Sequence, residues 1–246
     1  MRLIVPLTVL LASASVAYPQ SKSLALSSAE GLTLHNIIAT PATLQGKKGL
    51  KLTGPPSAER PGPPTKGGLK KGGGGPGGPE ANRQDHLALL DGVEFTNGTI
   101  EVDLAGEPGA GAAGGARGFV GVAFRVQPDR KTYDCFYLRP TNGRADDQER
   151  RNHSAQYIQH PNFPWFKLRQ ETPSKYESYV DIGPAEWIHV KIEVNGDKAK
   201  LFVNNHPQPA LIVNDVKSGA SAKGAVALWI EGSTIAHYAN LKVTAN

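Results

Sequence analysis

Residues 133–179 carry most of the side chains with which this sequence of 246 residues could bind or transform a ligand. A strand over 133–139 would place Tyr137 and Arg139 on one face and Phe136 and Leu138 on the other, because successive side chains point to opposite faces. If Phe136 and Leu138 face the core, the other pair lines an outer surface. Aromatic rings and planar donors are the groups that stack on sugar rings and bind hydroxyls or carboxylates. The residues that we predict to contact substrate are Tyr137, Arg139, Asn142, Arg144, His153, Tyr157 and Trp165.

The same region contains groups for acid–base catalysis, although their spacing matches no established motif. A general base would be a histidine or a tyrosine, a general acid would be a carboxyl group, and Arg139 would hold substrate charge. The candidate acids and bases are Tyr137, Asp146, Asp147, His153 and Glu177. A second interpretation remains open, in which these charged residues form a solvated surface loop held by Arg–Asp pairs, and Trp165 anchors it.

Motifs for cofactors and metals are missing from the sequence. The single cysteine, Cys135, and the seven histidines do not show the close spacing of a zinc site. There is also no phosphate loop, dinucleotide fingerprint or nucleophile elbow around a serine. We therefore predict no cofactor. Asp146-Asp147 leaves a structural calcium ion open, although the ligand spacing of an EF-hand loop is absent.

The formal net charge of +5 comes from one segment and is not spread over the chain. Residues 47–84 contain eight basic and two acidic residues, whereas residues 85–246 contain 17 basic and 19 acidic ones. This distribution argues against a nucleic-acid-binding domain, whose basic residues would lie on a folded face. Residues 54–84 are rich in Gly and Pro and are predicted to be a disordered insertion that could attach to an acidic surface.

The N-terminus has the three parts of a secretory signal. One positive charge at Arg2 is followed by the apolar run 3–12, and Ser15-Val16-Ala17 fits a cleavage site before Tyr18. The run is too short to span a membrane, and no longer apolar run follows it. We therefore predict a signal peptide over 1–17 and a secreted protein, which would be periplasmic or on the cell surface in a bacterium. In a eukaryote, the sequons at Asn97 and Asn152 could be glycosylated.

The mature chain shows the period of two that is typical of β-strands. Apolar residues alternate with polar ones over 99–104 and again over 187–194, and the second run leads through Asn195-Gly196 into 199–203. Asn-Gly between two such runs is a strong hairpin signal. No segment after residue 17 has a convincing helical period. Many short strands predict an all-β fold, a two-sheet antiparallel jelly-roll sandwich. Its first strands would lie in 18–53 and the remainder in 85–246.

Several of these segments resemble one superfamily in their order along the chain. They are Phe95–Asp103, Gly118–Arg125, Glu186–Val194 with its hairpin, Ala225–Glu231 and Tyr238–Val243. Together they resemble the concanavalin A-like lectins and glucanases, and within these the laminin-G-like and 3-keto-disaccharide hydrolase group. The resemblance covers residues 31–53 and 85–246. It implies the concanavalin A-like fold, whose concave sheet is typically the one that binds sugar.

Three functions follow from the residues and the resemblance. The first is a secreted module that binds an oligosaccharide or polysaccharide on its concave sheet and the loop 137–165. The second is a glycoside-cleaving enzyme of the 3-keto-disaccharide hydrolase type. The two are distinguished by whether His153, Asp146 or Asp147, and Tyr137 converge in one cleft. The third is a cell-surface or matrix domain that binds another protein. The acids Glu101 and Asp103 do not complete the carboxylate motif of the related glucanases, and we interpret them as the polar side of a strand.

Overall fold

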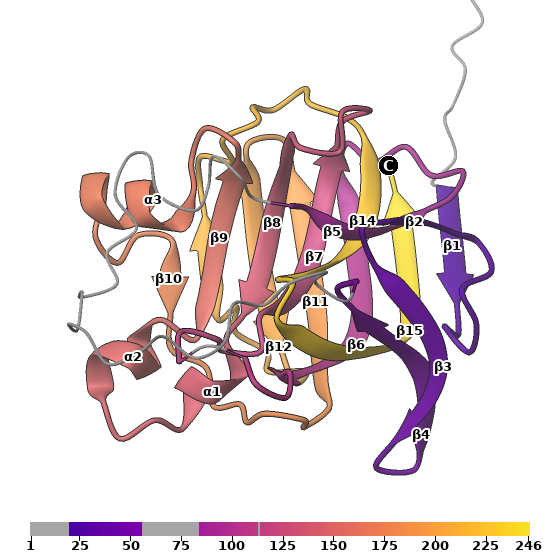
Figure 1. Ribbon diagram of the computed structural model, residues 1–246. Coiled ribbons are helices and arrows are strands. Elements are labelled where there is room, and N and C mark those ends of the chain that lie inside the picture. The colour runs from indigo at the N-terminus through magenta and orange to yellow at the C-terminus, as the bar shows by residue number, and fades with distance from the viewer. Residues whose placement is uncertain (1–19, 56–83, 113) are drawn as a thin grey trace, which may run out of the picture.

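Two antiparallel β-sheets packed face to face make up the part of the chain that the computed structural model describes, residues 20–55, 84–112 and 114–246 (Figure 1). Sheet A consists, in spatial order, of β13 (Leu211–Val213), β12 (Lys198–Val203), β11 (Ile188–Asn195), β6 (Gly98–Pro108), β15 (Thr234–Ala245), β4 (Lys47–Thr53) and β3 (Ile38–Leu44), with β1 (Gln20–Leu24) also paired to β15. Sheet B consists of β10 (Glu177–Ser178), β9 (Ala155–His160), β8 (Tyr133–Leu138), β7 (Val120–Val126), β14 (Ala225–Ile230), β5 (His86–Leu90) and β2 (Leu32–His35). The predicted all-β, two-sheet antiparallel sandwich is confirmed.

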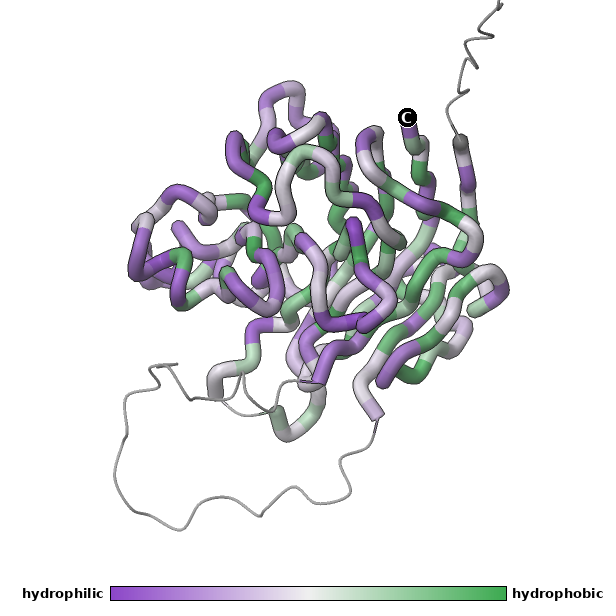
Figure 2. Tube along the Cα trace, turned by 90° about the horizontal axis from the view of Figure 1, so that it is seen from above, coloured by the Kyte–Doolittle hydropathy of each residue, from purple (hydrophilic) through white to green (hydrophobic). Residues whose placement is uncertain are grey.

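The alternating segments of the sequence become central strands of sheet A. In β11 every second residue, from Ile188 to Val194, is buried, and β6 shows the same alternation over 100–104. The hairpin between β11 and β12 turns at Gly196, whose φ of +61° suits glycine. Hydrophobic residues accordingly run along the strands, whereas hydrophilic ones gather at the outer bends (Figure 2).

The two faces of sheet B can be assigned from contacts between the sheets. A Cβ atom placed on Gly106 of sheet A would lie 2.8 Å from Cγ1 of Val120, so Val120 faces the core. Val120 lies opposite Leu138, and Phe136 stacks on Phe124 at 6.2 Å between ring centroids. Tyr137 alternates with these residues and therefore lies on the face turned away from sheet A. This confirms the predicted division of residues 133–139 into two faces, but the prediction that Tyr137 and Arg139 line an outer surface is wrong, because they are only 2% and 5% exposed.

Three short helices, which no pattern in the sequence predicted, lie at the β9–β10 side of sheet B (Figure 1). They are α1 (Pro140–Gly143), α2 (Gln148–Asn152) and α3 (Trp165–Glu171). Each is too short to show a helical period in the sequence, and local capping marks α2, where the Asp147 side chain accepts a hydrogen bond from the Arg150 amide at 3.0 Å. None of the helices among the described residues is long and apolar enough to span a membrane.

The small-residue segment 105–118 is not entirely a loop. β6 continues into it as far as Pro108 and pairs there with β15. The small side chains permit this, because Gly106 approaches the backbone oxygen of Gly118 closely: a Cβ atom there would lie only 2.4 Å from that oxygen. The signal peptide over 1–17 and nearly all of the 54–84 insertion lie outside the described residues. Both remain predictions.

Candidate functional site

One row of side chains crosses five strands of sheet B on the face turned away from sheet A. Register places the members directly opposite one another. In order from β10 to β14 they are Glu177, Gln156, Tyr137, Gly121 and Trp229. We call this set the outer row. It contains a carboxylate, an amide and two aromatic rings within one sheet width.

Arg139, which follows β8, connects the polar half of the outer row. Its guanidinium donates to the Tyr137 hydroxyl at 2.9 Å and to Oε1 of Gln156 at 3.1 Å. A third hydrogen bond reaches the backbone oxygen of His153 at 2.7 Å, and Nη1 lies 3.5 Å from Oε1 of Glu177. The Gln156 amide nitrogen donates to the backbone oxygens of Tyr157 and Tyr176, which turns its own oxygen toward Arg139. Arg139 is thus held rigidly by several acceptors.

Glu177 contacts nitrogen-bearing side chains from three segments. Besides Arg139, its carboxylate pairs with Arg169 of α3, and Nδ1 of His153 lies 3.0 Å from Oε2. Burial by itself would raise the pKa of the Glu177 carboxyl group, but His153, Arg169 and Arg139 together lower that pKa to about 2. The Glu177 carboxylate therefore stays charged and is not available as a general acid.

This network predicts a loss of stability in acid that depends on Glu177. The pKa of Glu177 is lowered from 4.5 in the unfolded reference to about 2, so its contribution to folding is complete above about pH 4.5 and is lost as the pH falls toward 2. Urea unfolding of the wild type at a series of acidic pH values should show this loss, and Glu177→Gln should show a flatter profile. Parallel profiles for the two proteins would contradict the prediction.

The aromatic half of the outer row is a stacked pair. The Tyr137 and Trp229 rings lie 5.0 Å apart at 29°, and Phe119 meets the Tyr137 ring edge-on at 5.9 Å. Gly121 permits this arrangement, because a Cβ atom there would lie 2.6 Å from Cβ of Tyr137. Burial raises the pKa of the Tyr137 hydroxyl to about 12. Tyr137 is therefore a neutral hydrogen-bonding group and not a base near neutral pH.

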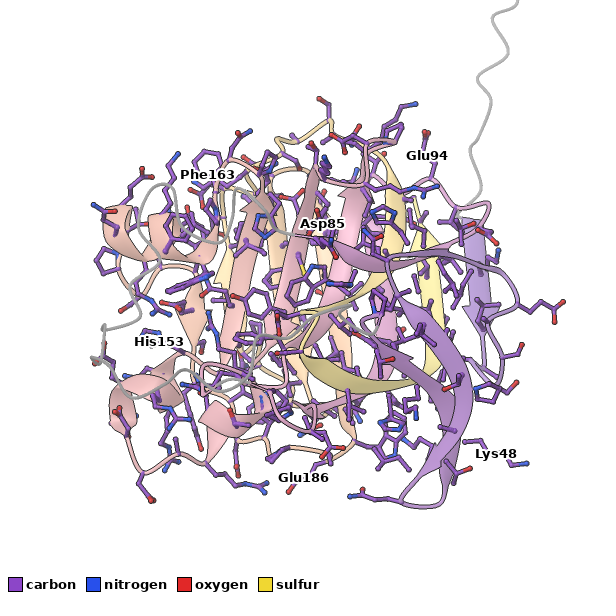
Figure 3. The ribbon with its side chains drawn as sticks, in the orientation of Figure 1. Lys48, Asp85, Glu94, His153, Phe163 and Glu186 are labelled. Carbon is purple, nitrogen blue, oxygen red and sulfur yellow. The ribbon has the colours of Figure 1, made fainter. Side chains whose placement is uncertain are left out.

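His153 and Arg169 are the partly exposed members of the cluster. Their side chains are 17% and 33% exposed, whereas that of Glu177 is 3% exposed. His153 lies beside β10, above α1 and α2 (Figure 3). The guanidinium of Arg169 stacks over the Trp165 ring at 4.7 Å, so the predicted residue Trp165 adjoins the cluster through Arg169. A ligand would therefore meet the imidazole and the Arg169 guanidinium first.

Of the other residues predicted to contact substrate, Asn142 adjoins the cluster, whereas Tyr157 and Arg144 do not. Asn142 is buried next to the cluster, and its amide donates to the His153 oxygen at 3.4 Å. The prediction that Tyr157 contacts substrate is wrong. Tyr157 alternates with Gln156 in β9 and therefore lies on the core face of sheet B, where its hydroxyl donates to Asp134 at 2.6 Å. Arg144 is also away from the cluster, paired with Asp181 and Glu186, the latter labelled at the lower edge of Figure 3.

The structure does not bring Asp146 and Asp147 into the cluster. Asp147 caps α2, and Asp146 is exposed in the turn before it. Of the predicted acids and bases, Tyr137, His153 and Glu177 converge. The interpretation of the charged residues as a loop of Arg–Asp pairs is also wrong for Arg144, whose aspartate partner, Asp181, comes from another segment. Glu101 and Asp103 lie on sheet A, where Asp103 contacts His189 at 2.8 Å across the strands, as expected for a polar strand face.

Three contributors were missed in the sequence: Gln156, Arg169 and Trp229. Trp229 lies in a strand whose apolar neighbours suggested only core, whereas Gln156 lies in the segment that was assigned to the loop 137–165; for both, alternation with core residues was the available signal. Arg169 lies in α3, which no pattern predicted. Its contact with Glu177 arises from tertiary folding and has no signature in the spacing.

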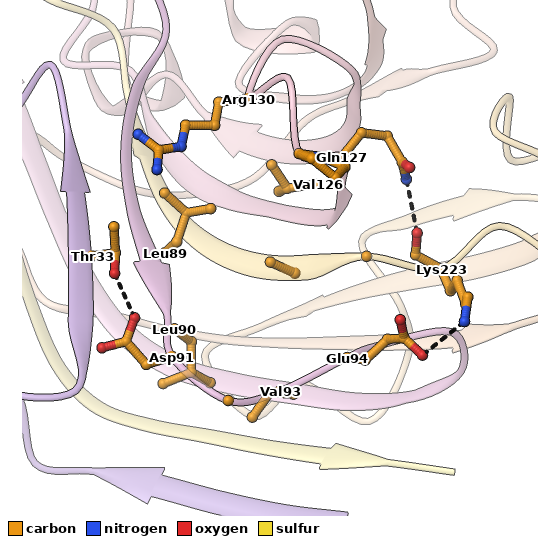
Figure 4. A pocket seen from close by; sticks show the side chains of 14 residues that line it. Thr33, Leu89, Leu90, Asp91, Val93, Glu94, Val126, Gln127, Arg130 and Lys223 are labelled. Carbon is orange, nitrogen blue, oxygen red and sulfur yellow. Dashed lines mark hydrogen bonds and ion pairs between the residues drawn. The ribbon is translucent and has the colours of Figure 1, made fainter.

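Neither a metal centre nor a large cavity at another end of sheet B coincides with this cluster. Among residues 20–55, 84–112 and 114–246, no group of three or more His, Cys, Asp or Glu side chains could hold a metal ion. A cavity of about 900 Å³ lies at the ends of β5, β7 and β14 (Figure 4). Its rim is held by Thr33–Asp91 and Glu94–Lys223 contacts, and it contains none of the predicted site residues.

Comparison with known proteins gave a family match and structural relatives. Residues 64–244 match the family model described as a 3-keto-alpha-glucoside-1,2-lyase-like domain. A search of curated proteins found no match.

Among solved structures, a Bacillus subtilis protein of unknown function with a galectin-like fold aligns with a TM-score of 0.53 and 11% identity, over 92% of this chain and 98% of that one. The carbohydrate-binding module CBM66 from Bacillus subtilis aligns with a TM-score of 0.49 and 14% identity, over 85% and 96%. A β-glucanase from Bacillus licheniformis aligns with a TM-score of 0.47 and 12% identity, over 92% and 98%. The fold is the concanavalin A-like sandwich that the resemblance implied.

Proposed function

The chain belongs to the family of 3-keto-alpha-glucoside-1,2-lyase-like domains, and from this premise we propose that the outer row and Arg139 form a sugar site. The observation that carries the proposal is that Arg139 connects the Tyr137 hydroxyl, the Gln156 amide and the Glu177 carboxylate on one face of sheet B. Gln156, Tyr137 and Trp229 are buried, at 0%, 2% and 7% exposed, and support the site from beneath. The partly exposed His153 imidazole and Arg169 guanidinium are the groups that would bind sugar oxygens. The ligand class is an oligosaccharide or polysaccharide.

A second function, cleavage of the bound sugar, is favoured by the contact between His153 and Glu177. The Glu177 carboxylate lies next to Nδ1 of His153 and orients the imidazole, so that Nε2 of His153 can act as the base. In a 3-keto glucoside the carbonyl group acidifies the proton on C2. We propose that Nε2 removes this proton, the C–H electrons form the C1–C2 double bond, and the C1–O bond breaks. The departing oxygen takes a proton from water or the imidazolium.

The roles of the remaining groups follow from their exposure. Arg169, which is partly exposed, would bind the enolate oxygen as charge develops there. Glu177 and Arg139 are nearly buried and act as positioning residues for His153. No oxidation occurs in this step, because the ketone is already present in the substrate.

Removal of His153 should separate cleavage from binding. We expect His153→Ala to lower the rate of elimination from methyl 3-keto-α-glucoside by about 10²–10⁴-fold, the usual contribution of a general base. Ultraviolet absorbance of the conjugated product measures the rate, and calorimetry measures binding. His189→Ala, on sheet A, is the matched control and should leave both unchanged.

The outcomes distinguish the two functions. If the wild type binds glucosides without cleaving the keto sugar, the domain is a binding module and the elimination is wrong. If His153→Ala cleaves like the wild type, another base acts. If the wild type neither binds nor cleaves, the sugar site is not on this face.

We further propose that the protein is secreted and that its basic insertion attaches it to acidic surfaces. The signal-like residues 1–17 and the charge of residues 47–84 support this. Detection of the protein in culture medium, cleaved after Ala17, would test the export.

A further inference from the structure

A cavity of about 640 Å³ next to Tyr179 has the composition of a sugar subsite. Tyr179 is 41% exposed, which is unusual for a large ring in this chain. Arg151 holds the ring in place, since its guanidinium carbon lies 4.9 Å from the ring centroid and Nη2 donates to the hydroxyl at 2.9 Å. A fixed and exposed aromatic ring is the element on which a sugar face stacks.

Polar groups surround this ring on the cavity wall. They are Asp181, Asn204, His206 and Gln208, and the cavity lining also includes the apolar residues Val203 and Pro209. Within residues 20–55, 84–112 and 114–246, no group hydrogen-bonds to the side-chain amide of Gln208, and Asn204 uses only Oδ1, which accepts from the His189 amide at 3.1 Å. The amide groups are therefore available to hydroxyls of a neutral ligand.

The cavity adjoins the proposed sugar site through neighbouring contacts. Tyr179 lies two residues after Glu177, and its partner Arg151 lies two residues before His153, the partner of Glu177. The Arg151–Tyr179 contact therefore lies next to the His153–Glu177 contact. Two residues of extended chain span about 7 Å, of the order of one sugar unit. A saccharide longer than one ring could reach both.

We propose that this cavity is a second subsite, which binds a neutral sugar ring of an oligosaccharide whose other end occupies the outer row. The inference rests on the proposed function and specifies it further: the preferred ligand has more than one ring. Tyr179 supplies the stacking surface, and Asn204 and Gln208 supply the hydrogen bonds that orient the ring.

Substitution of Tyr179 tests the subsite by comparing ligands of different length. The probes are methyl α-glucoside and maltopentaose, measured by calorimetry on the full chain. Tyr179→Ala should weaken binding of maltopentaose about tenfold, as expected for loss of one aromatic stack, and leave methyl α-glucoside unchanged. Tyr179→Phe keeps the ring and should retain most of the affinity. Ile212→Ala, an exposed residue of β13 outside the cavity, is the matched control.

The results separate this subsite from the proposed function. Equal affinity of wild type and Tyr179→Ala for maltopentaose would overturn the subsite while leaving the outer row as the sugar site. An equal loss for both probes would also overturn it, because Tyr179 would then act on the first site. Binding of neither probe by the wild type would overturn the sugar site and the subsite together.

Discussion

Replacement of Arg139 by alanine is expected to abolish sugar binding, with a loss of affinity of about 100-fold or more. The arginine is 5% exposed and joins Tyr137, Gln156, His153 and Glu177. Its removal leaves the buried carboxylate of Glu177 without one of its two arginine partners, and the aromatic and imidazole groups lose their common anchor. Calorimetric titration with methyl α-glucoside and maltopentaose measures the loss.

A double variant distinguishes a binding role from a structural one. Arg139→Ala should also lower stability, because the buried Glu177 carboxylate loses one of its two arginine partners. Arg139→Met combined with Glu177→Leu instead removes both charges and keeps the volume. We expect the double variant to recover stability in urea unfolding but not binding. Recovery of binding in that variant would show that Arg139 does not contribute to the sugar site.

Substitution of Arg125 should destabilise the fold far more than substitution of an exposed arginine. Arg125 is 1% exposed and donates to the backbone oxygens of Thr96, Gly196 and Gly219 and to Oγ of Ser218. These acceptors come from separate connections at one end of the sandwich, so Arg125 ties them together. Arg125→Met should lower the free energy of unfolding by about 3–5 kcal/mol, because four partly buried acceptors lose their donor at once.

The control for Arg125 is an arginine that is also well paired but much more exposed. Arg144 contacts Asp181 at 2.8 Å and Glu186 at 2.6 Å, with a side chain 55% exposed. Arg144→Met should cost little or no stability, as exposed ion pairs contribute little. Urea unfolding measures both. Similar losses for the two variants would contradict the role assigned to burial.

The fold could be predicted from the sequence because strand alternation and turn residues are local patterns along the chain. Alternation in 188–194 and the Asn195-Gly196 turn determine which face of β11 is buried and how the chain returns. The same alternation predicted that Tyr137 and Arg139 leave the core. The short helices were not predicted, since α3 has seven residues and begins after Pro164 without a side-chain cap.

The site was predictable only where strand alternation determined it. Tyr157 was misplaced because it was assigned to a loop, whereas it occupies a core position in β9. The central role of Glu177 was also not evident: its β10 is two residues long, and its partners come from three other segments. Contacts of this kind depend on how the connections fold over the sheet edge, which a pattern of residues does not specify.

The pairing of β1 with β15 determines how the domain would respond to a mechanical load. The strands are antiparallel, and Gln20 lies opposite Ala245, so the two ends of the fold leave from the same end of one ladder (Figure 1). Tension applied between the ends would load the backbone hydrogen bonds one pair at a time and peel β1 away. β15 would still be held by β6 and β4 after that step. Under tension, therefore, the domain would yield first as a release of its first strand, with the sandwich and its outer row still in place.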